Sequence, residues 1–312
     1  MRVLIIGGTG FISKHVTKLF AQNGHQVSIF HRNSKNSFTT GLDVVEIIGE
    51  RDDITSFKKE FQSFEPDLVI DTIAYTAQDI WGLQLALKGV TNHLLLLSSG
   101  DVYKAYDTFH RNLADIDNSL LTEQSPLRTR LYPYKPQSID QYDELLFNYD
   151  KIIVEQMAHE NFHTTILRLP AVFGPGDQQQ KLGEYIIPMY TNHQFIKLSP
   201  NKANWIWTRS YVENVAHGVY LAATSKITKT ELFNFGDINL KEFDLVTRLK
   251  ELCDWKGEII IANNVDERFN YAQNIQMDNS KIKRLLNYAP PTNDEHALVK
   301  MIENYRSPKM GL

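Results

Sequence analysis

The chain has 312 residues, of which 42% are hydrophobic, and its 33 Lys and Arg against 37 Asp and Glu give a net charge of -4 at pH 7. This is the composition of an ordinary globular protein, and a slightly acidic chain without a run of basic residues argues against a nucleic-acid partner. The single cysteine, Cys253, has no His or Cys companions, so neither a disulfide framework nor a metal site is expected. The first strand is expected to begin at residue 2, and no apolar run approaches the ~20 residues needed to cross a bilayer, so we expect a cytoplasmic protein without membrane contact.

The opening residues predict a strand, a tight turn and a helix. Residues 2–6 form an apolar run without polar alternation, which is typical of a strand buried on both faces. Gly7, Gly8 and Gly10 follow, and a helical pattern then continues to Gly24. A turn of this kind leaves backbone N–H groups free at a helix N-terminus, where a pyrophosphate can lie against them.

The spacing of Gly7, Gly10 and Ser13 is a G-x-x-G-x-x-G variant with serine in the last place. The next strand, expected at 26–30, arrives where the dinucleotide-binding fingerprint requires it. Glycines also end strands in proteins that bind nothing, but this context favours a cofactor site. The residues expected to bind the cofactor here are Gly7, Thr9, Gly10, Phe11 and Ile12.

The residues after this second strand, His31-Arg32-Asn33, suggest which cofactor binds. In an NAD site this strand end usually carries an acidic residue that accepts hydrogen bonds from the ribose hydroxyls. No acid is present, and Arg32, with Ser34 and Lys35 nearby, could pair with a 2′-phosphate. The sequence therefore favours NADP over NAD, although Arg32 could also be an ordinary solvated arginine.

Two further strands are expected at 44–48 and 67–74. After the first, Asp52 or Asp53 either contacts an adenine amino group or caps the next helix, which is the commoner use. The second ends at Ile73 and Ala74, which are expected to line the cofactor channel.

Strands and helices continue to alternate, with a helix expected at 77–88 and a strand at 93–97. This order predicts an α/β protein with a Rossmann-type doubly wound parallel sheet, in which ligands collect outside the carboxyl ends of the strands. Ser98, Ser99 and Tyr103 follow the strand at that edge. The two serines either end the strand or aim a hydroxyl at a substrate.

The periodicity fails from 106 to 142, and a loop of this length is usually a lid or a binding segment. A helix is expected at 140–161 and a strand at 164–169, after which Pro170 is expected at the cofactor.

Shorter elements after Gly174 indicate a smaller C-terminal α/β lobe, with a substrate cleft between it and the sheet. The expected organisation is an NAD(P)-binding domain at 1–173, to which 205–236 return, and a substrate-binding lobe at 174–204 and 237–312.

Several motifs occur in the order that is typical of one family. They are Gly-Gly-Thr-Gly-Phe-Ile at 7–12, Ser-Ser-x-x-Val-Tyr at 98–103, Lys151-x-x-x-Glu155, Arg168 followed by Phe-Gly-Pro-Gly-Asp at 173–177, Tyr-Val-Glu-Asn-Val-Ala at 211–216 and Asn-Phe-Gly at 234–236. The chain thus resembles the extended short-chain dehydrogenase/reductases, the NAD(P)-dependent sugar epimerases, dehydratases and reductases. The resemblance covers nearly the whole chain.

The resemblance implies roles for three residues. In such enzymes a tyrosine exchanges a proton with the substrate oxygen while the nicotinamide exchanges hydride. A lysine four residues later lowers the pKa of that tyrosine and holds the nicotinamide ribose, and a hydroxyl from the fifth strand polarises the substrate. Carried over, Lys151 is the lysine, Ser99 is the hydroxyl, and the place of the tyrosine is taken by Phe147.

Phenylalanine has no exchangeable proton, so the proton donor is relocated or lost, or Phe147 packs beneath the nicotinamide while water carries the proton. On a continuous helix, two residues rotate the side chain by about 200°, which would aim Tyr149 away from the face of Lys151. The candidates from other segments are Tyr103, beside Ser99, and residues of the long loop, namely Tyr134, Lys135 and Tyr142.

A sugar-nucleotide dehydratase is less expected than a reductase or epimerase, because Gly100 stands where similar dehydratases have an aspartate and Asp101 takes the place of their glutamate. The expected function is NADP-dependent redox chemistry at a secondary alcohol or ketone, including epimerisation, of a sugar or sugar nucleotide. The alternative is a catalytically silent NAD(P)-binding sensor or scaffold.

The resemblance also implies a homodimer, because this family often dimerises through the helix that carries the lysine and the helix before the fifth strand. Trp81, Leu85, Ile153 and Met157 suit such a helical interface, and burial within one chain would explain them equally well.

Overall fold

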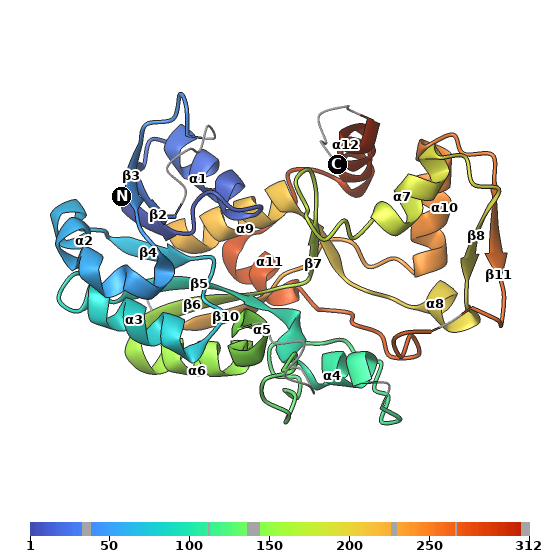
Figure 1. Ribbon diagram of the computed structural model, residues 1–312, viewed down its shortest axis with the longest axis horizontal. Helices are drawn as coiled ribbons and strands as arrows, with labels where there is room; N and C mark the ends of the chain where they lie inside the picture. Colours follow the sequence, from blue (N-terminus) through green and yellow to red (C-terminus); the bar gives the residue numbers. More distant parts are fainter. Residues whose placement is uncertain (33–38, 112, 136–143, 226–229, 266, 307–312) are drawn as a thin grey trace.

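The computed structural model describes residues 1–32, 39–111, 113–135, 144–225, 230–265 and 267–306. Within them, a seven-stranded sheet occupies the left half of Figure 1, and a smaller group of helices and strands occupies the right half. None of the described helices is long and apolar enough to span a membrane.

All seven strands of the main sheet run parallel. Their spatial order is β10 (Glu231–Asn234), β6 (His163–Leu169), β5 (His93–Ser99), β4 (Leu68–Asp71), β1 (Arg2–Ile6), β2 (Gln26–His31) and β3 (Val44–Ile48). From β1 the strands are added first on one side, as β2 and β3, and then on the other side, beginning with β4. The switch point between β1 and β4 is where ligands bind in doubly wound folds. The expected parallel α/β sheet is confirmed.

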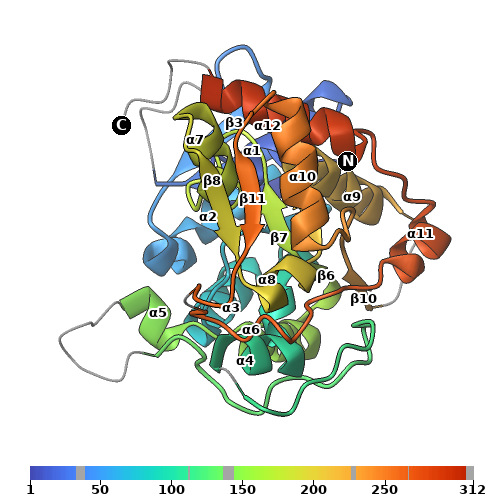
Figure 2. The ribbon, with the colours of Figure 1, turned by 90° about the vertical axis from the view of Figure 1, so that its right-hand side faces the viewer.

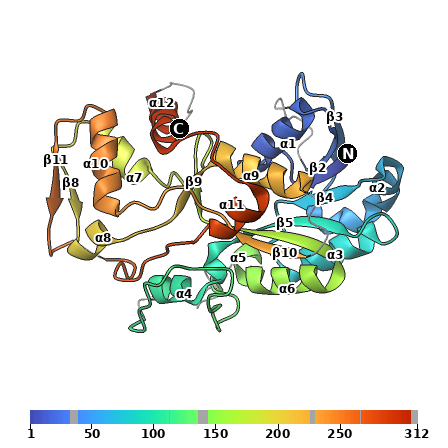
Figure 3. The same cartoon turned by 180° about the vertical axis from the view of Figure 1, so that it is seen from behind.

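Helices cover both faces of this sheet (Figures 1 and 3). One face carries α1 (Ser13–Gln22) and α9 (Val212–Thr224), and the other carries η1 (Arg51–Phe57), α2 (Lys58–Phe64), α3 (Ala77–Leu87) and α6 (Lys151–Asn161). Val3 and Ile5 of β1 pack under the first set, whereas Leu4 and Ile6 pack under the second. A strand with both faces covered must be apolar throughout, which explains why β1 lacks polar alternation.

The smaller group is built around two parallel strands, β8 (Phe195–Leu198) and β11 (Glu258–Ile261), which face the viewer in Figure 2. Its helices are α7 (Gly183–Tyr190), α8 (Pro200–Asn204), α10 (Glu242–Leu252) and α12 (Asp294–Arg306). A short pair, β7 (Ala171–Phe173) with β9 (Arg209–Tyr211), lies between the two groups, and α11 (Ser280–Leu286) packs on β10. The sequence-based division into two domains stays a prediction.

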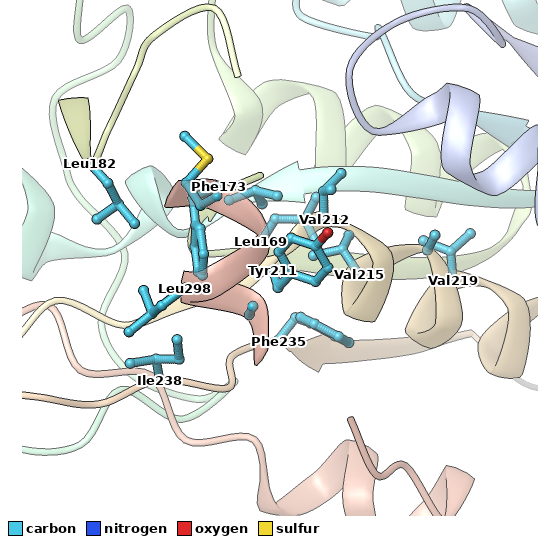
Figure 4. Close-up of a cluster of buried hydrophobic side chains, with 14 of the residues drawn as sticks. Leu169, Phe173, Leu182, Tyr211, Val212, Val215, Val219, Phe235, Ile238 and Leu298 are labelled. Atoms are coloured by element: carbon cyan, nitrogen blue, oxygen red, sulfur yellow. The ribbon is translucent and has the colours of Figure 1, made fainter. Parts of the chain in front are cut away.

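A continuous apolar core joins these parts. Figure 4 shows side chains from β7, β9 and α9 together with residues distant in sequence, and those it labels are Leu169, Phe173, Leu182, Tyr211, Val212, Val215, Val219, Phe235, Ile238 and Leu298. A built Cβ on Gly218 would lie 2.1 Å from the Phe235 ring, so only glycine lets α9 approach the segment after β10 this closely.

Two expectations between 104 and 161 are wrong. The stretch expected to be all loop begins with helix α4 (Lys104–Arg111), which follows the short η2 (Gly100–Val102). The single helix expected at 140–161 is instead two helices, α5 (Glu144–Asn148) and α6, separated by Tyr149 and Asp150. Asp150 causes the break, because it adopts extended backbone angles and its carboxylate caps α6 by accepting from the N–H of Ile152 at 2.9 Å.

His15 on α1 provides a stability prediction. Burial lowers its pKa from 6.5 to about 4, with Lys14 adding to the effect, so the unfolded chain binds the proton more readily between these values. Stability is therefore expected to fall as pH decreases from 6.5 towards 4. After discounting for partial exposure, acidification from pH 7 to pH 5 should cost about 1 kcal/mol through this residue. Denaturant unfolding of wild type and His15→Gln at both pH values measures this, and an equal acid loss in the variant would contradict it.

Candidate active site

The glycine turn after β1 has the geometry of a phosphate-binding turn. Gly7 has φ +89°, and a Cβ built there would lie 2.8 Å from both Ile73 Cγ2 and Thr72 Oγ1, so only glycine fits. The Ser13 hydroxyl donates to the Gly7 carbonyl at 2.6 Å and accepts from the Gly10 N–H at 2.8 Å, which fixes the turn from within.

Two backbone donors remain at this turn. In the described part of the chain the N–H groups of Phe11 and Ile12 have no acceptor, and both precede the first residue of α1. Gly10 is exposed and has no side chain to cover them. Unpaired N–H groups at a helix N-terminus bind phosphate oxygens, so these residues fit the pyrophosphate of a dinucleotide.

Lys14, which the sequence analysis did not single out, lies beside the same turn. A Cβ built on Gly176 would lie 2.8 Å from Lys14 Nζ and 3.8 Å from Phe11 Cδ2, so the loop after β7 brings its backbone against the lysine and the turn. Burial lowers the pKa of Lys14. No described carboxylate forms an ion pair with it, and its charge is therefore available to a phosphate. The position of Lys14 in the first turn of α1 is the sequence signal that could have predicted a contact with phosphate.

The end of β2 has one feature that favours NADP and one that favours NAD. Arg32 is exposed there, whereas Ser34 and Lys35 lie outside the described residues. The structure brings a carboxylate to this edge from the next strand, because Glu46 Oε2 lies 2.8 Å from His31 Nε2. The absence of an acid on β2 is therefore a weaker argument for NADP than the sequence suggested.

Asp53 is exposed on η1 and caps neither η1 nor α2. Arg51, the first residue of η1, is half-buried and was not predicted from the sequence. Its guanidinium lies 2.7 Å from Asp71 at the end of β4 and 3.1 Å from Asp79 on α3. The adenine contact of Asp53 stays a prediction.

Lys151 is the best-defined polar side chain at the sheet edge. Its Nζ donates to the Ala74 carbonyl at 2.5 Å and to the Leu97 carbonyl at 3.0 Å, and it lies 4.8 Å from the centre of the Tyr75 ring. Burial lowers the pKa of Lys151 to about 8. The structure thus brings Lys151 against Ala74, which was expected to line the cofactor channel, and against Leu97 of β5.

The two candidate hydroxyls after β5 differ. Ser99 is half-buried, and its oxygen accepts from the Asp101 N–H at 3.2 Å, which leaves its own hydrogen free to donate. Tyr103 is fully buried, with its hydroxyl 2.5 Å from Asn234 Oδ1 and 3.0 Å from Arg168 Nη1. This burial argues against a catalytic role for Tyr103, which stays a prediction.

The remaining predicted cofactor residues lie nearby. Ile73 and Ala74 lie two and three residues after the end of β4, and Pro170, which is half-buried, joins β6 to β7. Their contacts with a cofactor stay predictions.

Phe147 and Lys151 do not share a helix, so the comparison of side-chain directions made from the sequence is wrong. Phe147 is on α5, and Lys135 Nζ lies 4.1 Å from its ring centre. Tyr149 lies in the break, and its ring is 6.0 Å from that of Tyr75, the ring which Lys151 also contacts. Tyr149 is therefore directed towards the surroundings of Lys151.

Asp101 accepts hydrogen bonds from two tyrosine hydroxyls. From the sequence it was considered only as the residue in the place of a dehydratase glutamate. Tyr149 donates to Asp101 Oδ2 at 2.7 Å, and Tyr134 donates to the same oxygen at 3.1 Å. The second oxygen, Oδ1, is buried without a described partner. Complete burial raises the pKa of Asp101. Of the donors proposed from other segments, Tyr134 reaches this carboxylate, whereas Lys135 is exposed and lies over the Phe147 ring. Tyr142 lies outside the described residues.

Arg128 connects Asp101 to Asp150, the N-cap of the helix α6 that begins at Lys151. Its guanidinium donates to the Asp101 carbonyl at 3.1 Å and to Asp150 at 2.6 Å, and both ionic side chains are almost fully buried. The Tyr132 N–H also donates to Asp150 at 2.7 Å. The loop before α5, the segment after β5 and the cap of α6 thus meet at one ion pair.

Comparisons with known proteins agree with the fold. Residues 3–114 match the model of the NAD dependent epimerase/dehydratase family. The match thus covers the N-terminal part of the chain, about a third of its length. Within the match lie the glycine turn, Ala74 and Ser99, whereas Lys151 and Tyr149 lie beyond it.

Two curated relatives are dehydrogenases, each 25% identical over 245 residues. They are the decarboxylating sterol-4-alpha-carboxylate 3-dehydrogenase of Candida albicans and the 3-beta-hydroxysteroid dehydrogenase of Mycolicibacterium neoaurum. The matches cover 73% and 71% of this chain, but only 66% and 60% of the length of these relatives.

Solved structures with the same fold extend over nearly the whole chain. The UDP-glucuronic acid 4-epimerase of Bacillus cereus, solved with UDP-glucuronic acid and NAD, has a TM-score of 0.72 at 16% identity, with 98% of this chain and 99% of that one covered. The dTDP-glucose 4,6-dehydratase of Bacillus anthracis, solved with NAD, has a TM-score of 0.71 at 16% identity, with 98% and 96% covered.

Proposed function

We propose that the chain uses NAD(H) or NADP(H) to oxidise a secondary alcohol or reduce a ketone, either as a net reaction or within an epimerisation. The observation that carries the proposal is the position of Lys151, whose Nζ donates to the carbonyls of Ala74 and Leu97. These carbonyls lie at the carboxyl edge of the sheet, where the glycine turn after β1 also lies. A bound nicotinamide would supply the hydride acceptor or donor.

The residues of the chain have separate tasks in this proposal. The N–H groups of Phe11 and Ile12, with Lys14, would hold the pyrophosphate, and Lys151 would hold the nicotinamide ribose. Ser99 would donate a hydrogen bond to the substrate oxygen, because its hydrogen is not used within the chain. The silent alternative relied on Phe147. The hydroxyl of Tyr149, whose ring packs on the Tyr75 ring that Lys151 also contacts, supports the active alternative.

The direct experiment has two steps. Fluorescence titration with all four nicotinamide dinucleotides measures binding, and a panel of sugar nucleotides, free sugars and 3-hydroxysteroids is then screened for changes in reduced-nicotinamide absorbance. Epimerisation, which leaves this absorbance unchanged, is followed by product chromatography. We expect micromolar binding and turnover of at least one class. Absence of dinucleotide binding would overturn the proposal.

We further propose that NADP is preferred and that Arg32 pairs with its 2′-phosphate. Arg32→Ala should weaken NADP binding about tenfold and leave NAD binding unchanged, since loss of a charge-assisted hydrogen bond costs about 1.5 kcal/mol. Titration of both cofactors into both proteins measures the ratio. Equal weakening for the two cofactors would show that Arg32 does not read the phosphate.

The homodimer and the cytoplasmic location stay predictions. Trp81 and Leu85 of α3 are 48% and 39% exposed, so their side chains are available to a second copy.

A further inference from the structure

The break between α5 and α6 places a hydroxyl where a continuous helix could not. The Tyr149 ring stacks against Tyr75 with an interplanar angle of 27°, and Lys151 Nζ approaches the same Tyr75 ring. Tyr149 is only partly buried, so a ligand at the sheet edge can contact it. Tyr149 and Lys151 therefore lie beside one aromatic ring at the mouth of the strands.

The proton of Tyr149 already has an acceptor. Its hydroxyl donates to Asp101 Oδ2 at 2.7 Å, and this leaves the lone pairs of the tyrosine oxygen free to accept a hydrogen bond from a substrate hydroxyl. The other carboxylate oxygen, Oδ1, is buried and has no partner in the described residues. A buried carboxylate with an unused oxygen is a costly arrangement that a protonation step would relieve.

We propose that Tyr149 and Asp101 form a proton relay that replaces the tyrosine missing at Phe147. This inference rests on the proposed function. In alcohol oxidation the substrate O–H proton moves to the Tyr149 oxygen while the proton of Tyr149 moves to Asp101 Oδ2, and the hydride leaves the same substrate carbon for the oxidised nicotinamide. The reverse transfers accompany ketone reduction, and an epimerisation uses both in turn.

A relay fits this site better than an ionised tyrosine. Burial and the neighbouring carboxylate of Asp101 hold the pKa of Tyr149 well above its usual value, so a free tyrosinate is disfavoured. In the relay the tyrosine is never ionised, because it receives one proton as it passes on another. The charge moves instead to or from Asp101, whose pKa burial raises above that of an ordinary carboxyl.

Tyr134 is the competing donor, since it reaches the same oxygen at 3.1 Å. Its ring packs against His110 and lines a pocket of about 370 Å³ together with Arg111, Arg128 and Arg130. No ring contact joins Tyr134 to Tyr75 among the described residues, whereas Tyr149 has one. Tyr134 is therefore placed to orient Asp101, and Tyr149 is placed to exchange the proton.

The test compares single-hydroxyl deletions, using the substrate that the screen identifies. Tyr149→Phe should lower kcat by ~10²–10⁴, the usual range for loss of general acid–base help, with cofactor affinity unchanged. Tyr134→Phe removes a hydroxyl from the same carboxylate and serves as the matched control, for which less than a tenfold loss is expected. Phe147→Tyr should change kcat less than threefold.

The pH profile provides a second measurement. Oxidation requires ionised Asp101, so its rate should fall as pH decreases through the raised pKa of that carboxyl, and Asp101→Asn should remove this limb together with most of the rate. The ionisable groups that face Asp101 are Tyr106, Arg128, Tyr134, Tyr149 and Lys151. Burial lowers the pKa of Lys151 to about 8, so Lys151 is expected to govern the alkaline limb.

The outcomes separate the two proposals. Turnover by the wild type with a Tyr149→Phe rate within threefold would overturn the relay and leave the proposed function intact, and a large loss in Tyr134→Phe alone would assign the role to that residue. Wild-type protein that binds a dinucleotide but turns over no substrate of the panel would overturn both.

Discussion

Lys151→Met is expected to lower kcat by ~10²–10⁴ and to weaken cofactor binding. The substitution keeps the volume of the side chain but removes both hydrogen bonds to the carbonyls at the ends of β4 and β5, together with the charge beside Tyr75. Steady-state kinetics and dinucleotide titration measure the two effects. In the wild type the same residue should make the rate fall as pH rises through about 8, because above this value the lysine is uncharged.

Lys135→Met is the control for this variant. Lys135 is also near the position expected for the tyrosine, since it lies over the Phe147 ring, but its side chain is exposed. Its removal should leave the rate unchanged. A Lys151→Met protein with full activity would show that the lysine is wrongly assigned.

Arg128→Met should be strongly destabilising. Arg128 and Asp150 are each about 1% exposed, so methionine would leave the Asp150 carboxylate buried without its counter-charge. Removing one partner of a buried pair typically costs about 3–5 kcal/mol of the free energy of unfolding. Because Asp150 also caps α6, we expect this variant to weaken cofactor binding and lower kcat even at temperatures at which it is fully folded.

Arg209→Met separates the stability effect from the effect on the site. Arg209 forms an equally buried pair with Glu242, at 2.8 Å, but it joins β9 to α10. Chemical denaturation should show a similar loss for both variants, and kinetics on the folded fraction should show a defect in Arg128→Met alone. Equal kinetic behaviour would mean that Arg128 contributes only stability.

The strands and the glycine turn were predictable because their signals are local. A strand buried on both faces must be apolar throughout, as Leu4 and Ile5 illustrate, and the turn needs glycine at Gly7 for a backbone reason that sequence spacing records. The family resemblance then identified Lys151 and Ser99, and the structure places both at the carboxyl edge of the sheet.

The proton-transfer cluster could not be found in this way. Tyr134, Tyr149 and Asp101 are separated by up to 48 residues, and only the tertiary fold brings the two hydroxyls to one carboxylate. One local signal was available, because aspartate before an apolar run is a common N-cap, and reading Asp150 as a cap would have shown that the helix begins at Lys151.

Glu155, one turn after Lys151, determines which part of the molecule can move. It accepts from Ser98 at 2.5 Å and pairs with Arg168 at 2.7 Å, so α6 is cross-linked to the neighbouring strands β5 and β6 from inside the protein. Sliding or rotation of α6 over the sheet would break all of these buried bonds at once. Induced fit around a substrate is therefore confined to the surrounding loops, and the spacing of Lys151 from the strand ends should be the same for every substrate the enzyme accepts.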